Sequence, residues 1–321
     1  MPGALALQTA AFFVVLGLLW LGCGGLYLVN RAAWIAGATV TGIAVVAALH
    51  LGLGWALHSS QLTGVTVSAA MAVIGTFTWF GTQGARAVPK SFLAPAREVY
   101  LAAPYFVYGA LYYLFLFADR LIAWTAQTNA AALPLQFRGD YETALDLAMA
   151  AFVLQMGWVH ASLASFHHAV ATVQRSLPAG HYERFNSSLR DFYWWRVARI
   201  MAFGFASSGW VYFLVSRFDL LPFATMRPVL AIALVAFPVV VAGLWNTSLL
   251  FTLGRPRPVL GSIAFGAFAS LSSGYLLSRT GAYDAAVVGF LVGAFMFAAL
   301  STLGVLRVFQ KLDGNYYASA L

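Results

Sequence analysis

Long stretches without a charged residue are the feature that most constrains this chain. No Asp, Glu, Lys or Arg occurs from Met1 to Asn30, or from Ala32 to Ala85. About 20 apolar residues cross the hydrocarbon core of a bilayer as an α-helix, which satisfies its own backbone hydrogen bonds. These stretches are too long for barrel strands and lack their strict alternation. They therefore predict an all-α, polytopic membrane protein.

The composition of the whole chain supports this class. Charged residues make up 9% of the 321 residues and hydrophobic residues 61%, whereas soluble domains carry about 25% charged residues. So few charges cannot cover a water-exposed surface, which excludes a soluble enzyme and a disordered regulator. The single cysteine, Cys23, excludes a disulfide scaffold. The net charge is +8. In a membrane chain, the distribution of positive residues between the two sides indicates orientation rather than nucleic-acid binding.

The apolar stretches predict about nine membrane spans. We expect the turn between the second and third spans at His58–Gly64, where polar residues and glycine interrupt the pattern. A basic loop with prolines precedes the fourth span, and a polar segment at 167–196 follows the fifth. The predicted spans cover residues 4–28, 33–57, 63–83, 100–124, 143–166, 197–216, 228–252, 259–278 and 285–306.

The distribution of basic residues predicts the orientation of these spans. With nine spans, 13 of the 18 Lys and Arg residues fall on one side of the membrane. Positive charge stays cytoplasmic, so we expect an outside N-terminus and a cytoplasmic C-terminus. The residues on the cytoplasmic side are Arg31, Arg86, Lys90, Arg97, Arg175, Arg184, Arg190, Arg196, Arg199, Arg255, Arg257, Arg307 and Lys311.

The polar segment 167–196 is cytoplasmic in this orientation. It combines arginines with aromatic residues, among them Phe192 and the pair Trp194-Trp195. This pattern predicts an amphipathic helix in the headgroup layer, with its arginines on anionic lipid. Docking of a cytoplasmic synthase on the segment is the alternative interpretation.

Two short motifs flank the gap between the fourth and fifth predicted spans. Asp119, Arg120 and Trp124 close one apolar stretch, and Tyr141 and Glu142 open the next. These motifs resemble the Pel exopolysaccharide transporter (PelG) family, within the superfamily of multidrug, oligosaccharidyl-lipid and polysaccharide flippases. In that family an apolar helix closes on Trp-x-Asp-Lys-x-x-x-Trp, and a Tyr-Asp pair opens the next helix.

The resemblance implies two six-helix bundles, the second of which opens with the motif helix. Three predicted spans precede that helix here, so the chain aligns with helices four to twelve and is expected to be N-terminally shortened. Residues 1–95 are then a partial first bundle of three spans, and residues 96–321 the second bundle. The tail Phe309–Leu321 also resembles the family's ending, whereas Ala161–Phe166 lacks the acidic residue of the next motif helix.

One face of the fourth predicted span is a candidate substrate pathway. Its aromatic residues, at steps of three and four residues from Asp119, are Tyr105, Tyr108, Tyr112 and Phe115. Sugars stack on aromatic rings, and tyrosine hydroxyls hydrogen-bond them. An ionisable group at lipid depth costs at least about 2.5 kcal/mol and is a functional hypothesis by default. The alternative is that Asp119 and Arg120 begin the outer loop and the tyrosines serve helix packing.

Asp146 completes the candidate residues. It lies one turn into the fifth span, at the same predicted depth as Arg120, so we expect an ion pair between them. The pair is either structural or part of the substrate pathway. Deeper in the same span, Gln155 and His160 are polar residues at lipid depth. We expect His160 to hydrogen-bond between helices, and a role as proton carrier is the alternative.

The predicted function is that of an inner-membrane component of exopolysaccharide export. It would move polysaccharide or lipid-linked sugar by alternating access of two helix lobes, without catalysis, metal or cofactor. The sequence has no Walker A, HExxH or GxSxG motif. Expected partners are the bilayer, a cytoplasmic glycosyltransferase and other membrane subunits. The alternatives are an integral-membrane acyl- or glycosyltransferase and a non-catalytic subunit of a membrane complex.

The predicted orientation is testable by cysteine labelling or reporter fusions at Asn30, Gly180 and Ser319. We expect position 30 on the cytoplasmic side after one span, and positions 180 and 319 there as well, because the basic residues gather on that side. Labelling of Gly180→Cys by an impermeant reagent from outside intact cells would overturn the orientation.

Overall fold

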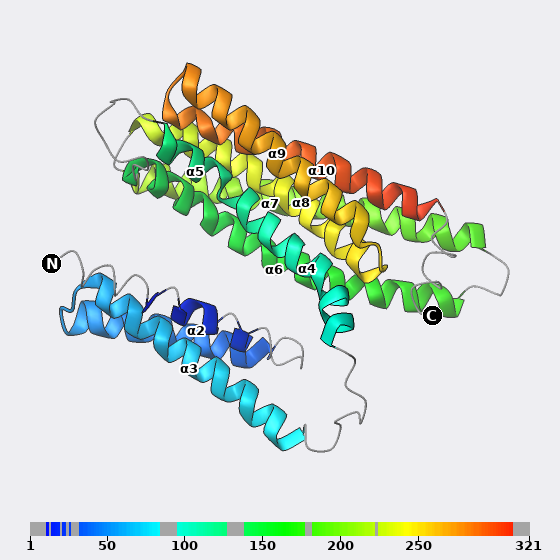
Figure 1. The fold of residues 1–321 in the computed structure, drawn as a ribbon, viewed down its shortest axis with the longest axis horizontal. Coiled ribbons are helices and arrows are strands. Elements are labelled where there is room, and N and C mark those ends of the chain that lie inside the picture. The colour runs from blue at the N-terminus through cyan, green and yellow to red at the C-terminus, as the bar shows by residue number, and fades with distance from the viewer. Residues whose placement is uncertain are drawn as a thin grey trace. The chain divides into compact units, whose positions relative to one another are not determined.

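The computed structural model describes residues 11–12, 14–19, 21–23, 26, 32–83, 95–126, 138–176, 182–221 and 224–310. These residues are helical or lie in short connections, and they contain no β-strand (Figure 1). The predicted all-α class is therefore confirmed for this part of the chain. The chain divides into two compact units, Met1–Leu93 and Ala94–Leu321. Their assignment to the first and second bundles of a flippase stays a prediction.

The first unit contains a helical hairpin formed by α2 (Ala32–Ala47), the π-helical turn η1 (Ala48–Gly52) and α3 (Leu57–Gln83). Gly42 and Gly64 face each other where the helices cross, because a Cβ added to either would lie 2.7 Å from the carbonyl oxygen of the other. Ser68 Oγ donates to the Ala38 carbonyl at 2.9 Å in the same contact. Small residues thus let the two backbones approach closely, as membrane helices do.

The turn of this hairpin lies before the predicted one. The expected turn at His58–Gly64 is wrong, because α3 already begins at Leu57. The chain reverses around Gly54, whose φ of +67° is a left-handed conformation that glycine adopts without steric cost. Ser60 and Thr63 stay within the helix, where their hydroxyls hydrogen-bond carbonyls four residues earlier.

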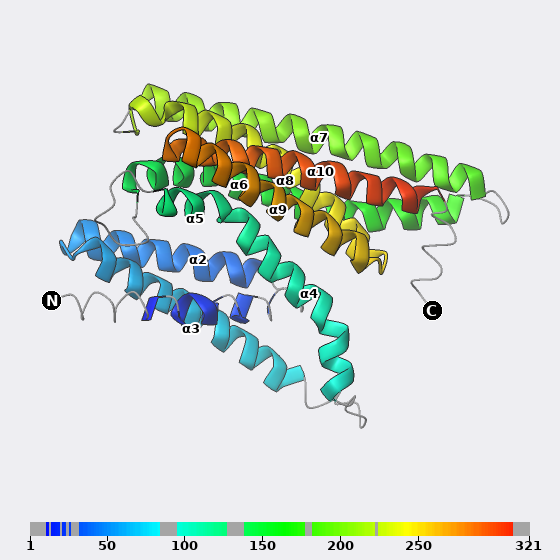
Figure 2. The ribbon, with the colours of Figure 1, turned by 45° about the horizontal axis from the view of Figure 1, so that its top comes forward.

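The second unit is a bundle of long helices that run side by side (Figure 2). Its elements are α4 (Pro95–Leu116), α5 (Ala118–Thr125), α6 (Gly139–Ser176), α7 (Tyr182–Arg217), η3 (Ala224–Met226), α8 (Arg227–Thr252), α9 (Pro256–Thr280), η4 (Tyr283–Ala285) and α10 (Ala286–Phe309).

The helix α8 forms the centre of the bundle. It has no charged residue between Arg227 and Arg255, and it packs against α6, α7 and α10. Residues on all its faces are buried, among them Phe237, Trp245 and Leu249. A helix that is apolar all round is stable when other helices surround it. The apolar pattern of α8 therefore determines its central position.

Small residues bring α9 and α10 together. On α9 these are Gly266, Ser270 and Gly274, four residues apart, and on α10 Gly289 and Gly293 lie opposite them. A Cβ added at Gly289 would clash with the backbone of Gly274. This spacing of small residues is typical of closely packed membrane helices.

Seven described helices are long and apolar enough to cross a membrane, which supports a multi-pass membrane protein. Their candidate spans are Ala33–Gly52, Ser59–Thr82, Val99–Leu116, Glu183–Arg217, Arg227–Thr252, Pro256–Thr280 and Tyr283–Phe309. The count of nine stays a prediction. Most of the first expected span, 4–28, lies outside the described residues, and the fifth, 143–166, falls in α6, which is not among the seven.

The segment 167–196 is divided between two long helices. The helix α6 continues to Ser176, and α7 is continuous from Tyr182 to Arg217, with no glycine or proline before Gly204 to end it. The buried stripe of α7 in this region is Phe185, Leu189, Tyr193 and Ile200. The segment is therefore not a helix of its own, and this stripe of α7 packs against protein. The position of the segment's exposed aromatic residues in the headgroup layer stays a prediction.

The substitution Gly289→Ala is expected to destabilise the bundle. The added methyl group would meet the backbone of Gly274, which cannot move aside as a side chain does, and such overpacking costs about 1–3 kcal/mol. The matched control is Gly261→Ala on α9, where a Cβ meets nothing within 4 Å and alanine favours the helix. Unfolding in detergent should occur at a lower temperature only for Gly289→Ala; equal temperatures would contradict the close packing.

Candidate functional site

The candidate site begins where α4 ends. Phe117 leaves the helical conformation, with φ −109° and ψ 6°, and α5 continues in a different direction (Figure 2). The predicted single helix 100–124 is therefore broken, and the candidate span Val99–Leu116 ends before the break. Asp119 and Arg120 belong to α5, where both are buried. They do not begin an exposed loop.

Arg120 is held by two carboxylates of α6. Its Nη1 lies 2.7 Å from Glu142 Oε2, and its Nη2 lies 2.8 Å from Asp146 Oδ1. The predicted ion pair with Asp146 is confirmed, whereas the ion pair with Glu142 was not predicted. Glu142 and Asp146 are four residues apart and therefore share a helix face. That spacing is the sequence signal that would have identified both partners.

The two ion pairs differ in exposure. The side chains of Arg120 and Glu142 are 10% and 6% exposed, whereas that of Asp146 is 65% exposed. The second oxygen of Glu142 accepts a hydrogen bond from Trp124 Nε1 at 2.7 Å. Burial raises the pKa of the Glu142 carboxyl, and Arg120 and Trp124 oppose that rise. The buried pair is therefore a structural contact, and Asp146 is the member open to the surroundings.

Asp119 has a different partner. Its Oδ2 accepts a hydrogen bond from the Tyr141 hydroxyl at 3.1 Å, and Asp119 is 2% exposed. Neighbouring residues on a helix point to different sides, so Asp119 and Arg120 bond to different residues of α6. We call Asp119, Arg120, Trp124, Tyr141, Glu142 and Asp146 the end cluster. Five of its residues belong to the two sequence motifs, 119–124 and 141–142, and the sixth is Asp146.

Contacts with α9 and η4 surround the end cluster. Arg279 donates to the carbonyl and hydroxyl oxygens of Thr125 at 2.7 and 2.8 Å. The hydroxyl of Tyr283 donates to Asp140 Oδ2 at 2.7 Å, and the Arg138 guanidinium lies 4.6 Å from the centre of the Tyr283 ring. Ends of four elements, α5, α6, α9 and η4, are thereby joined by polar contacts.

The tyrosines of α4 lie partly against α8. Tyr105 is 57% exposed and stacks on Phe251 with ring centroids 4.8 Å apart. The Tyr108 hydroxyl lies 3.0 Å from Thr247 Oγ1, and the Tyr112 ring stacks on that of Tyr108. Buried hydroxyls need partners, and a side chain of α8 supplies the one for Tyr108.

Phe115 separates these tyrosines from Asp119. It is fully buried, with its ring centroid 5.5 Å from that of Phe290 and 5.7 Å from that of Phe297 on α10. The predicted face is therefore not continuously open from Tyr105 to the carboxylate. Its open part is the end that carries Tyr105.

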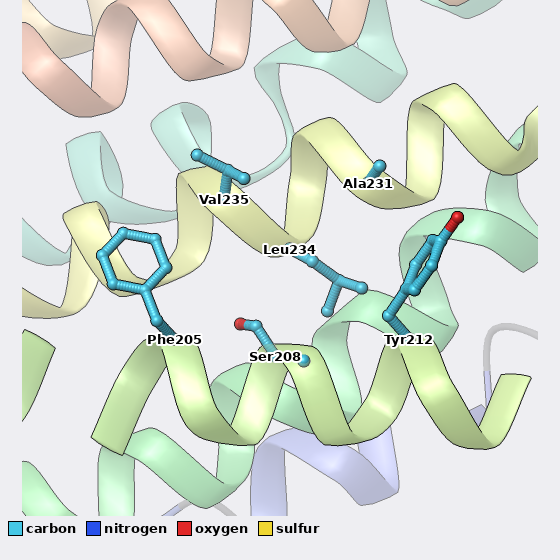
Figure 3. A pocket seen from close by; sticks show the side chains of 7 residues that line it. Phe205, Ser208, Tyr212, Ala231, Leu234 and Val235 are labelled. Atoms are coloured by element: carbon cyan, nitrogen blue, oxygen red, sulfur yellow. The ribbon is translucent and has the colours of Figure 1, made fainter. Parts of the chain in front are cut away.

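An apolar groove of about 300 Å³ lies between α7 and α8 (Figure 3). Its lining residues are Phe205, Ser208, Gly209, Tyr212, Ala231, Leu234 and Val235. Only Ser208 and Tyr212 contribute polar groups, and none of the lining residues is charged. Such a lining offers little to a sugar, so the groove is not the site of the predicted pathway.

Two other polar residues predicted at lipid depth lie in α6. Gln155 is buried, and its Nε2 donates to the hydroxyl oxygens of Ser207 and Ser208 on α7 at 3.0 and 3.2 Å. Gln155 thus joins α6 to α7 by hydrogen bonds that the sequence did not predict for this residue. The side chain of His160 lies outside the described residues. Within the described part of the chain, no group of three or more His, Cys, Asp or Glu could hold a metal ion.

No protein family, curated protein or solved structure matches this chain. The resemblance to exopolysaccharide flippases therefore rests on the motif residues of the end cluster and on the predicted helix count. In the structure, residues of the first motif contact residues of the second: Arg120 and Trp124 bond to Glu142, and Asp119 bonds to Tyr141.

Removing one partner of the buried ion pair is expected to cost more stability than removing both. Arg120→Met leaves the Glu142 carboxylate buried without its cation, which costs about 3–5 kcal/mol. Adding Glu142→Gln removes both charges and should recover part of the loss. The measurement is the unfolding temperature and folded yield after detergent extraction.

Two exposed carboxylates serve as controls for this cycle. Asp146→Asn removes only the exposed partner, and Asp219→Asn breaks the exposed pair with Arg227, whose atoms lie 3.5 Å apart. Exposed ion pairs contribute about 0–1 kcal/mol, so both variants should stay close to the parent protein. A double variant no more stable than Arg120→Met would count against the buried pair.

Proposed function

We propose that this chain is a non-enzymatic membrane component of exopolysaccharide export that moves polysaccharide or lipid-linked sugar across the bilayer. The observation that carries the proposal is the exposed stack of Tyr105 on Phe251, formed between two candidate membrane spans. Tyr108 and Thr247 add hydroxyl groups beside it. Aromatic faces with neighbouring hydroxyls suit sugar rings, whereas a face that meets only lipid needs neither.

The candidate residues take different roles in this proposal. Tyr105, Tyr108 and Tyr112 belong to the substrate pathway, and Asp146 is the exposed carboxylate able to contact sugar hydroxyls. Asp119 and Arg120 act by positioning, because their bonds to α6 hold α5 in place. Transport proceeds by alternating access of two helix lobes, with residues 1–95 as part of the first lobe and 96–321 as the second.

The proposal also includes location and partners. The chain lies in a bacterial inner membrane with its N-terminus outside and its C-terminus in the cytoplasm. A cytoplasmic glycosyltransferase supplies the polymer, and other membrane subunits of the export complex are further partners. A membrane-bound acyl- or glycosyltransferase is less well supported, because both oxygens of Glu142 are engaged and Asp119 is buried on Tyr141. Neither carboxylate is placed to act on a substrate.

The substitution Tyr105→Ala is expected to slow sugar transport without loss of folding. Its ring is exposed, so its removal leaves no cavity in the core, while the lost stacking contact is worth about two- to tenfold in rate. The measurement uses full-length chain in liposomes that carry a fluorescent lipid-linked oligosaccharide. Transport is followed as the fraction of label that becomes accessible to an impermeant quencher.

The control for this experiment is Tyr100→Ala. Tyr100 is an exposed tyrosine of the same helix, but five residues separate it from Tyr105, which places it on another face. It should transport at the parent rate. Equal slowing by both variants would argue against a pathway at Tyr105, and absence of transport by the parent chain would overturn the proposal that this chain moves the sugar.

A further inference from the structure

Two arginines of α7 are arranged around one tryptophan. The Arg199 guanidinium carbon lies 3.3 Å from the centre of the Trp195 ring. That of Arg196 lies 5.7 Å from the same ring and 5.2 Å from the ring of Phe192. Cation–π contacts of this kind hold guanidinium groups in a defined position. We call Phe192, Trp195, Arg196 and Arg199 the arginine–tryptophan site.

No carboxylate of the described residues neutralises these two cations. Among the described residues, the arginines that form ion pairs are Arg120 and Arg227. Arg196 Nε is buried and has no hydrogen-bond partner, and Asp191, one turn before Trp195, pairs with neither arginine. Like charges held near one ring repel each other. An anion bound to both guanidinium groups would remove the repulsion.

The site lies at the edge of the apolar part of α7. The candidate span Glu183–Arg217 is longer than a bilayer requires, and residues 200–216 contain no charge. The hydrocarbon-crossing part therefore begins directly after Arg199. Trp194 and Trp195 are 45% and 50% exposed, and exposed tryptophans at such an edge lie at the level of the lipid headgroups.

We propose that Arg196 and Arg199, arranged around Trp195, bind the phosphate of an anionic phospholipid headgroup. Guanidinium groups match phosphate in geometry and charge, and the site lies where that phosphate is found. In the predicted orientation the lipid belongs to the cytoplasmic leaflet, which carries anionic lipid. The binding does not depend on sugar export and goes beyond it.

Native mass spectrometry of the full chain, with equal amounts of phosphatidylglycerol and phosphatidylethanolamine, tests this site. We expect the chain to retain phosphatidylglycerol preferentially. Replacing both residues, Arg196→Gln and Arg199→Gln, should weaken retention by about fivefold for each arginine. Arg199→Gln alone provides a second variant, because Arg199 is exposed and its loss leaves the core unchanged.

The matched control removes two other arginines of α7, Arg184→Gln and Arg190→Gln. Both are exposed, and among the described residues neither contacts a ring. This double variant should keep the preference for phosphatidylglycerol within about twofold of that of the parent chain. Equal weakening by the two double variants would overturn a defined site in favour of general attraction by positive charge.

Two further measurements test the geometry of the site and the source of the phosphate. Trp195→Leu keeps both charges but removes the ring that positions them, so it should also weaken phosphatidylglycerol retention. Unchanged retention would overturn the proposed geometry. Inorganic phosphate should not raise the unfolding temperature as phosphatidylglycerol does. If it does so equally, and only with both arginines present, the ligand is soluble phosphate and the lipid assignment is wrong.

Discussion

The second unit depends on pairing the polar groups that its helices bring into an apolar interior. An amide without a hydrogen-bond partner is costly in such surroundings. Asn246 on α8 shows how the cost is avoided, since its Oδ1 accepts from the Tyr193 hydroxyl at 2.8 Å and its Nδ2 donates to Thr302 Oγ1 at 2.9 Å. These bonds connect α8 to α7 and α10. Small residues determine how closely helices approach, and the buried polar residues determine how they are rotated and shifted relative to one another.

The end cluster applies the same principle to charge. A buried guanidinium is stable there because Glu142 and Asp146 surround it and Trp124 occupies the remaining oxygen of Glu142. Such a pair adds little net stability compared with well-packed apolar residues, but its disruption is expensive. The pair therefore acts on the specificity of packing. It determines where α5 lies relative to α6, because Asp119 and Arg120 must both reach their partners on α6. The break at Phe117 becomes tolerable for this reason, since α5 is fixed by its own contacts rather than by continuity with α4.

The sequence predicted the features that depend on charge alone. The charge-free run of α8 and the pairing of Arg120 with Asp146 could be recognised because charges are rare and costly in this chain. Glu142 was not identified as a partner, although its spacing from Asp146 carried the information. The break at Phe117 had no signal, since no glycine or proline marks it. The continuity of α7 from Tyr182 to Arg217 was not predicted, because periodicity shows that a face is apolar and not where the helix that carries it ends. In the first unit, the turn residue Gly54 was missed because the mostly polar segment His58–Gly64 offered a stronger turn pattern.

In the proposed transport mechanism, these constraints limit how the second unit can move. The bonds of Gln155 join α6 to α7, those of Asn246 join α7, α8 and α10, and those of Arg120 join α5 to α6. Movement of one of these helices against its neighbours would leave several polar groups unpaired at once. Alternating access by this unit is therefore expected to be a rigid-body motion. The helix α4 is the exception, since most of its span is exposed and its hydrogen bond through Tyr108 involves a single pair of hydroxyls. In the proposed function, a sugar that stacks on Tyr105 would thus contact the exposed part of α4, which lies before the buried Phe115.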